Sequence, residues 1–151
     1  MAETLYMVFM YGTLKKGQPN EYFMNSLPCV EFLGLAETCK KYPLIINRDQ
    51  WNLPMLLNRE EKGKAVKGEV YQVNDDSLKE LDRFEGHPEF YERTEIEVEL
   101  IKDSKVVRCW TYFIKDFKED VQQEYLSHYD STGDHGLEYD QRENDEHPSQ
   151  S

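Results

Sequence analysis

The sequence has little that would suit it to nucleic acid, to a membrane or to an oxidising environment. Its 18 Lys and Arg residues stand against 30 Asp and Glu, a formal net charge of −12, whereas nucleic acids and anionic lipid surfaces bind clustered basic residues. Its three cysteines form no CxxC pair, and the first residues lack the basic region and apolar run of a secretory signal. No stretch has the length that crosses a bilayer. We therefore expect a cytoplasmic protein with reduced cysteines, without a nucleic-acid or membrane partner.

Signatures of metal and nucleotide sites are also missing. The four histidines share no metal-ligand spacing with the cysteines, which argues against zinc. A calcium-loop-like stretch begins at Asp130, but it has His135 where glycine is needed and Gln141 where glutamate is needed. Lys15 and Lys16 lie between two glycines, yet no GKS or GKT follows, so a nucleotide P-loop is excluded. We expect no metal and no cofactor.

The chain length favours one domain. Its 151 residues are enough for a hydrophobic core, and its 13% aromatic content suits a strand-rich fold. No repeat or linker divides the sequence, so we predict a single domain over residues 1–144 and a disordered tail over residues 145–151. For a short, acidic chain without a cofactor, a monomer is the simplest expectation.

An uncharged run near the N-terminus predicts a buried central strand. Residues 5–11 are all apolar or aromatic, and the run stops at Gly12. A buried strand that ends at a glycine leaves backbone N–H groups without partners, and the glycine lets a ligand approach them. We interpret this strand end as a candidate ligand-binding loop, with an ordinary exit from a strand as the alternative.

Alternation of apolar residues, prolines and glycines defines the other elements. These patterns predict three helices. The first is short, over 21–26, with Asn20 as its cap, and the main helix lies within 74–86 with Asp75 or Asp76 as its cap. The third is predicted over 117–127. Gly68 indicates a bulge or a close backbone approach inside a strand. Strands are predicted over 30–40, 44–46, 53–57, 64–74, 90–100 and 106–114.

One carboxylate interrupts the apolar face of the main helix. Leu78 and Leu81 precede Glu85 by seven and four residues, so all three share a face. A carboxyl group among leucines, at the C-terminal end of a helix, should hold its proton more tightly than usual. Glu85 is therefore a candidate acid/base group, or else a residue of a frayed last turn that reaches solvent. Asp82, at the edge of the face, is expected to be a structural hydrogen-bonding group.

Three motifs resemble those of the γ-glutamylamine cyclotransferase family, within the wider γ-glutamylcyclotransferase-like, AIG2-like group. They are YGTLKKGQPN, DRFEG, and YDSTGDHG with REN close behind, and the resemblance runs over residues 7–144. It implies an α+β fold with a mixed, barrel-like sheet, a few surrounding helices and a cavity at one end. It also implies that Glu85 is the general acid/base and that the glutamyl part of the substrate binds the backbone of Tyr11, Gly12, Thr13 and Leu14.

The implied reaction releases 5-oxoproline and a free amine, such as lysine from γ-glutamyl-ε-lysine, without metal or cofactor. The α-amine of the substrate attacks its own γ-carbonyl, and well-oriented internal reactions reach effective molarities of ~10⁵–10⁸ M. Tyr91 and Tyr129 are candidates to line the pocket, although without the family each would be a core tyrosine. Two alternatives remain, a cyclotransferase for γ-glutamyl amino acids or glutathione, and a non-catalytic binding protein of the same fold.

Overall fold

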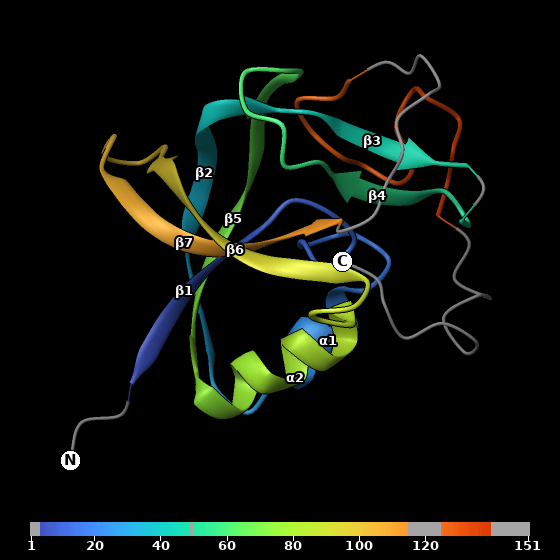
Figure 1. Cartoon of the computed structure of the whole chain (residues 1–151). Helices are drawn as coiled ribbons and strands as arrows, with labels where there is room; N and C mark the ends of the chain where they lie inside the picture. Colours follow the sequence, from blue (N-terminus) through green and yellow to red (C-terminus); the bar gives the residue numbers. More distant parts are fainter. Residues whose placement is uncertain (1–3, 49, 115–124, 140–151) are drawn as a thin grey trace.

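Five strands close into a barrel, and the predicted mixed, barrel-like α+β fold is confirmed (Figure 1). The computed structural model describes residues 4–48, 50–114 and 125–139, and the structure below is that of these residues. Strand β1 closes the barrel by pairing in parallel with β7 at Val8 and Trp110, whereas the other neighbouring strands are antiparallel. Around the barrel the strands follow the order β1 (Leu5–Met10), β5 (Lys64–Asn74), β2 (Val30–Tyr42), β6 (Tyr91–Leu100) and β7 (Val106–Ile114).

A small sheet and two helices lie outside the barrel. The sheet pairs β3 (Leu44–Asn47) with β4 (Leu53–Leu56). Helices α1 (Glu21–Ser26) and α2 (Asp75–Glu85) lie side by side below the barrel in Figure 1, where Phe23 and Phe84 stack with ring centroids 4.2 Å apart. No helix in the described part of the chain is long and apolar enough to span a membrane.

Two apolar clusters hold the fold together. The inner cluster fills the barrel with side chains from all five strands, among them Phe9, Ala36, Val70, Val98 and Phe113. The outer cluster lies between the barrel wall, both helices and β4, and it includes Met10, Met24, Leu53, Leu81 and Tyr112. Successive residues of β1 and β5 alternate between these clusters, as side chains of a strand must.

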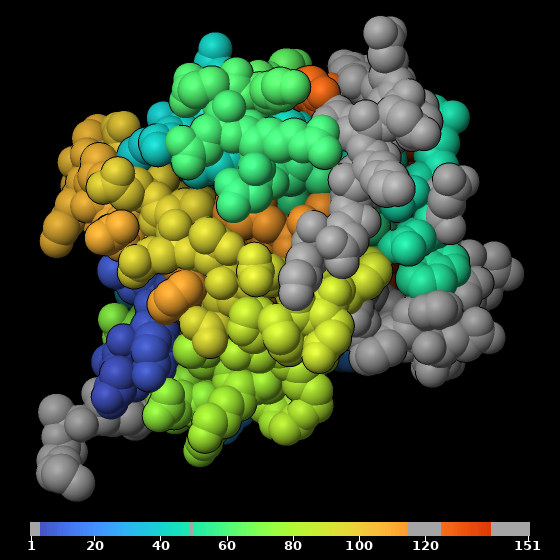
Figure 2. Space-filling model, in the orientation of Figure 1, coloured from blue at the N-terminus to red at the C-terminus, as the bar shows by residue number. Residues whose placement is uncertain are grey.

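Strand β6 has the predicted alternation. Ile96, Val98 and Leu100 are at most 6% exposed, whereas the glutamates between them are exposed. Figure 2 shows the outer surface of β6, in yellow, between α2 below it and the residues that precede β5 above it. Burial of β1 is less complete than predicted, since Leu5 is 48% exposed and only Val8 to Met10 are fully covered. The reason is that β1 pairs with β7 only at Val8, so its first residues extend past that neighbour.

The predicted helix ends are partly wrong. Helix α2 is capped by Asn74, whose side-chain oxygen accepts a hydrogen bond from the Ser77 N–H at 3.0 Å, and not by Asp75 or Asp76. Its predicted end at Gly86 is confirmed by a left-handed φ of 70°. Asn20 occupies the cap position of α1 but makes no side-chain cap hydrogen bond.

The remaining predictions concern the C-terminal part. Residues 125–127, the last three of the helix predicted over 117–127, are not helical, and residues 117–124 lie outside the described residues. The same holds for the tail predicted over 145–151, so the domain boundary remains a prediction.

Candidate active site

The loop that follows β1 is buried and anchored at several points. Tyr11, Thr13 and Leu14 are each at most 2% exposed. The Asn20 backbone N–H donates to the Thr13 carbonyl at 2.8 Å, and its side-chain Nδ2 donates to Thr13 Oγ1 at 2.9 Å. The Tyr11 hydroxyl donates to the Tyr112 carbonyl in β7 at 2.6 Å. Asn20 therefore fixes this loop from α1, and Tyr11 fixes it from the barrel.

Two backbone N–H groups of the loop have no hydrogen-bond acceptor among the described residues. Within the described residues nothing accepts a hydrogen bond from the backbone N–H of Gly12 or of Leu14, although the Gly12 carbonyl accepts one from Lys15 N at 3.2 Å. Buried backbone N–H groups are nearly always paired, so unpaired ones are suited to bind a carboxylate or an oxyanion. This is the arrangement expected where a buried strand ends at a glycine.

The carboxyl group of Glu85 is completely buried. The residue ends α2 with no exposed surface, and neither carboxyl oxygen has a hydrogen-bond partner among the described residues. Burial raises the pKa of Glu85 well above its ordinary value, and the nearby charge of Asp82 raises it further. The predicted position of Glu85 among the leucines is confirmed, and the alternative, a side chain that reaches solvent, is wrong.

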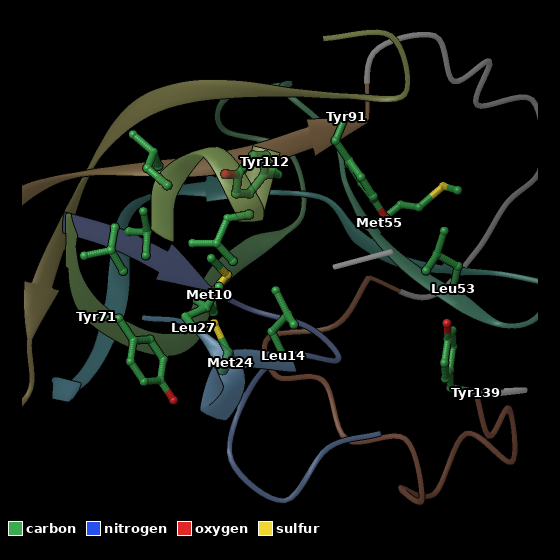
Figure 3. Close-up of a cluster of buried hydrophobic side chains, with 14 of the residues drawn as sticks. Met10, Leu14, Met24, Leu27, Leu53, Met55, Tyr71, Tyr91, Tyr112 and Tyr139 are labelled. Carbon is green, nitrogen blue, oxygen red and sulfur yellow. The ribbon is translucent and has the colours of Figure 1, made fainter. Parts of the chain in front are cut away.

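Two tyrosines lie close enough to Glu85 for its charge to raise their pKa. Burial is the main cause of the raised pKa of both Tyr112 and Tyr139, and the Glu85 charge adds to it. A hydrogen bond with Asn20 acts on Tyr139 in the opposite sense. Both tyrosines belong to the outer cluster together with Leu14, whose side chain lies beside Met24 in Figure 3. Residues from α2, β7, the β1–α1 loop and the C-terminal segment thus gather in one apolar region.

Asp82 lies one turn before Glu85 and is held by two partners. Its Oδ1 accepts hydrogen bonds from Arg93 Nε and from the Tyr112 hydroxyl, each at 2.8 Å, and its Oδ2 accepts one from Arg93 Nη2 at 3.2 Å. The prediction that Asp82 is a structural hydrogen-bonding group is confirmed. Because this network fixes a negative charge beside Glu85, it also favours the protonated form of that carboxyl group.

The two tyrosines that were predicted to line a pocket, Tyr91 and Tyr129, lie in different places. Tyr91 is fully buried in the outer cluster with Tyr112, and its hydroxyl donates to the Pro54 carbonyl at 2.8 Å. Figure 3 shows its ring directed toward Met55. Tyr129 is fully buried in the inner cluster instead. Tyr91 thus shares a cluster with Tyr112, and Tyr129 lies near enough to Tyr139 to raise its pKa, so a pocket role for either remains a prediction.

Sequence reasoning missed three residues of this region. Asn20 was expected only as a helix cap, and its membership of YGTLKKGQPN was the one signal that it could belong to the loop. Nothing in the sequence marked Tyr139 as a residue of this region. Nothing distinguished Tyr112 from the other aromatic residues of a strand, because alternation indicates a face and not a neighbour.

In the described part of the chain, a buried carboxyl group and two loop N–H groups have no hydrogen-bond partner. A barrel that carries them has the parts of an enzyme that works by proton transfer on a small molecule. Residues 8–134 match the family described as "Gamma-glutamyl cyclotransferase, AIG2-like". The chain belongs to this family.

Relatives in the family are similar over most of their length. The gamma-glutamylaminecyclotransferase of Bos taurus is 41% identical over 140 residues, which cover 91% of this chain and 83% of that protein. The human gamma-glutamylaminecyclotransferase is 37% identical over 151 residues, covering 91% and 98%. The crystal structure of an AIG2-like protein from Mus musculus superposes with a TM-score of 0.86 at 36% identity, covering 93% of this chain and 98% of that one.

Proposed function

We propose that this protein is a γ-glutamylamine cyclotransferase, which converts a γ-glutamyl amine such as γ-glutamyl-ε-lysine into 5-oxoproline and the free amine. The observation that carries the proposal is the fully buried Glu85 carboxyl group, whose oxygens have no partner among the described residues. A structural carboxylate in such a place would be costly without a partner. Membership of the family and relatives named as gamma-glutamylaminecyclotransferases support the assignment.

The β1–α1 loop is proposed to hold the glutamyl part of the substrate. Its α-carboxylate, or the oxyanion that forms at the γ-carbon, would accept hydrogen bonds from backbone N–H groups of Tyr11, Gly12, Thr13 and Leu14. The unpaired donors of Gly12 and Leu14 support this role. Donors that are fixed before the reaction need no reorganisation when charge develops, and the hydrogen bonds from Asn20 provide that rigidity.

Glu85 is proposed to move the proton. It accepts a proton from the α-ammonium group of the substrate, whose pKa is roughly 8, and the freed amine attacks the γ-carbonyl carbon. The new C–N bond closes the five-membered ring. Glu85 then donates its proton to the departing nitrogen as the original C–N bond breaks. The ring nitrogen, which still carries one proton too many, loses it by the same route, and the released amine takes it up and leaves as an ammonium ion. An acid/base works best when its pKa is near the working pH, which the raised pKa of Glu85 favours.

The test is a comparison of three substrates. Incubation with γ-glutamyl-ε-lysine, γ-glutamyl-alanine and glutathione, followed by an assay for 5-oxoproline, is expected to give product mainly from the first. Preference for either of the others would instead assign the enzyme to γ-glutamyl amino acids or to glutathione. No product from any of the three would favour a binding protein that keeps the fold. As further parts of this proposal, the enzyme is cytoplasmic, needs no cofactor and is a monomer.

Replacing Asp82 by Asn is expected to shift the pH profile to lower pH. The substitution removes the negative charge that raises the pKa of Glu85 and leaves the charge of Arg93, its ion-pair partner, uncompensated. The titratable groups that interact electrostatically with Glu85 are Asp82 on α2, Tyr112 on β7 and Tyr139, and Arg93 on β6 interacts with Tyr112. Since Glu85 must be ionised to accept a proton, kcat/KM should rise at a lower pH than in the wild type.

The expected size of the shift in the pH profile follows from a coupling free energy of roughly 0.7–1.4 kcal/mol between the neighbouring charges of Asp82 and Glu85. At a pH below the midpoint of the wild-type profile, kcat/KM relative to its plateau should increase about three- to tenfold. An equal loss at every pH would mean that Asp82 acts only on the structure, and Asp76→Asn in the first turn of α2 serves as the control.

A further inference from the structure

A hollow lies beside the loop that follows β1, and none of its lining residues is assigned a role in the site proposed above. Its volume is about 520 Å³, within the usual 300–1,000 Å³ of small-molecule sites. Charged and apolar side chains both contribute to its wall. The lining residues are Lys15, Leu35, Ala36, Lys67, Gly68, Glu69, Ile101 and His128.

Lys15 contributes a buried cation to this hollow. It is only 4% exposed, and its Nζ donates to the Tyr129 carbonyl at 2.6 Å. An ammonium group has three protons to donate, and no other described residue accepts one of them. Burial lowers the pKa of Lys15 to about 8, which the charges of Glu69 and Asp130 partly oppose, so the group is mostly charged at neutral pH. A buried ammonium with free donors is suited to an anionic ligand.

Glu69 contributes a buried anion to the same wall. It is 7% exposed, and its Oε1 accepts hydrogen bonds from the Lys16 N–H at 3.0 Å and from the Tyr71 hydroxyl at 2.7 Å. No described residue donates to its Oε2. The charge of Glu69 raises the pKa of Lys15, although the two side chains form no ion pair within 4 Å among the described residues. The hollow therefore presents two buried charges of opposite sign, those of Lys15 and Glu69, and each retains capacity for a further hydrogen bond.

An apolar edge completes the hollow. Leu35 and Ile101 are 57% and 59% exposed, and they adjoin each other because the Ile101 N–H donates to the Leu35 carbonyl at 2.9 Å. Exposed aliphatic side chains beside a polar hollow are suited to cover the apolar part of a ligand.

We propose that this hollow is a binding site for a free α-amino acid with an aliphatic side chain. Lys15 binds the carboxylate, Glu69 binds the ammonium group, and Leu35 and Ile101 contact the side chain. The two charges of a zwitterion match the two buried charges of the wall, whereas a simple anion or a simple cation would leave one of them unpaired. Lys67 adds an exposed positive charge to the wall, whereas burial lowers the pKa of His128 and so disfavours its charged form. The proposal is independent of the reaction at Glu85.

The ligand requirement can be tested by titration with leucine, observed by isotope-edited NMR on the full chain. Two analogues each lack one charge: 4-methylpentanoate has no ammonium group, and 3-methylbutylamine has no carboxylate. Leucine is expected to saturate at millimolar concentration and to shift the resonances of residues 15, 69 and 101. Each analogue should bind at least about tenfold more weakly. No saturable binding of leucine, or equal binding of all three compounds, would overturn the proposal.

Two variants test the assignment of each charge. Glu69→Gln keeps an acceptor for the Lys16 N–H and should weaken leucine about tenfold without changing 4-methylpentanoate. Lys15→Met should weaken leucine similarly without changing 3-methylbutylamine. Lys105→Ala, in the exposed turn before β7, is the control and should bind leucine normally. Glu85→Gln should also bind it normally, which separates this site from the catalytic one.

Stability is measured by thermal unfolding before each titration. If Lys15→Met does not fold, the leucine affinity of Glu69→Gln alone decides whether leucine binds in this hollow. A folded Glu69→Gln protein with unchanged leucine affinity would exclude the proposed ammonium site.

Discussion

Replacing Glu85 by Gln is expected to lower the turnover of γ-glutamyl-ε-lysine by about 10³-fold or more. Gln has nearly the same shape, so the substrate should still bind, but it can neither accept the proton of the α-ammonium group nor return one to the leaving amine. A positioned acid/base contributes about 10²–10⁴-fold to a reaction, and here one group performs both transfers. The measurement is 5-oxoproline release at saturating substrate, where kcat should fall and KM should change little.

The same substitution should leave the protein equally stable or make it more stable. A carboxyl group whose pKa is higher in the folded than in the unfolded state releases its proton more readily when unfolded, so ionisation favours unfolding. Wild-type stability should therefore fall as the pH rises from the unfolded pKa of ~4.3 through the raised folded pKa, by about 1.4 kcal/mol for each unit of difference. Gln does not titrate and avoids this loss.

Thermal unfolding at two pH values tests whether the substitution raises or lowers the stability. At pH 8 the Glu85→Gln protein should unfold at a higher temperature than the wild type, and near pH 4 the two should be similar. Glu89→Gln, at an exposed position four residues along the chain, is the control and should change neither turnover nor this pH dependence. Near-normal turnover by the Glu85 variant would remove the proposed mechanism, and lower stability at pH 8 would show that the carboxyl group is satisfied in the folded protein.

Local signals in the sequence were enough to find Glu85. Leucines at seven and four residues before it, and a glycine directly after it, determine both its face and the end of its helix. The ranges of the strands could also be predicted from local patterns, because alternation and the residues that end a strand are visible in neighbouring positions of the sequence. The helix cap was misassigned to Asp75 or Asp76, since three neighbouring residues, Asn74 included, are all chemically able to cap and only the backbone geometry decides among them.

The neighbours of Glu85 could not be found in this way. Tyr112 and Tyr139 are 27 and 54 residues away from it in the chain, and their proximity results from closure of the barrel and from the path of the C-terminal segment. No periodicity carries that information. Likewise, the apolar run of β1 does not reveal where the neighbouring strand ends, so the exposure of Leu5 could be seen only in the structure.

Gly68→Ala is expected to reduce stability by about 3 kcal/mol or more, although it adds only one methyl group. A Cβ at this position of β5 would lie 2.4 Å from the Met10 carbonyl oxygen and 2.6 Å from the nearest atom of the Phe9 ring. Overpacking of a core typically costs about 1–3 kcal/mol and sometimes more. Here one of the contacts is to backbone, which cannot rotate away. The close backbone approach that Gly68 indicated in the sequence is thus confirmed.

The effect should extend from stability to catalysis, because the strand that must move leads directly into the β1–α1 loop. Met10 pairs with Glu69 and immediately precedes Tyr11, so any shift of β1 displaces the backbone donors proposed to bind substrate. At about 2–4 °C for each kcal/mol in a chain of this size, the melting temperature should fall by roughly 6–12 °C. Lys64→Ala, at an exposed position of the same strand, should stay within about 0.5 kcal/mol of the wild type. If the Gly68 variant melts like that control, β1 and β5 are not in the close contact on which the position of the loop depends.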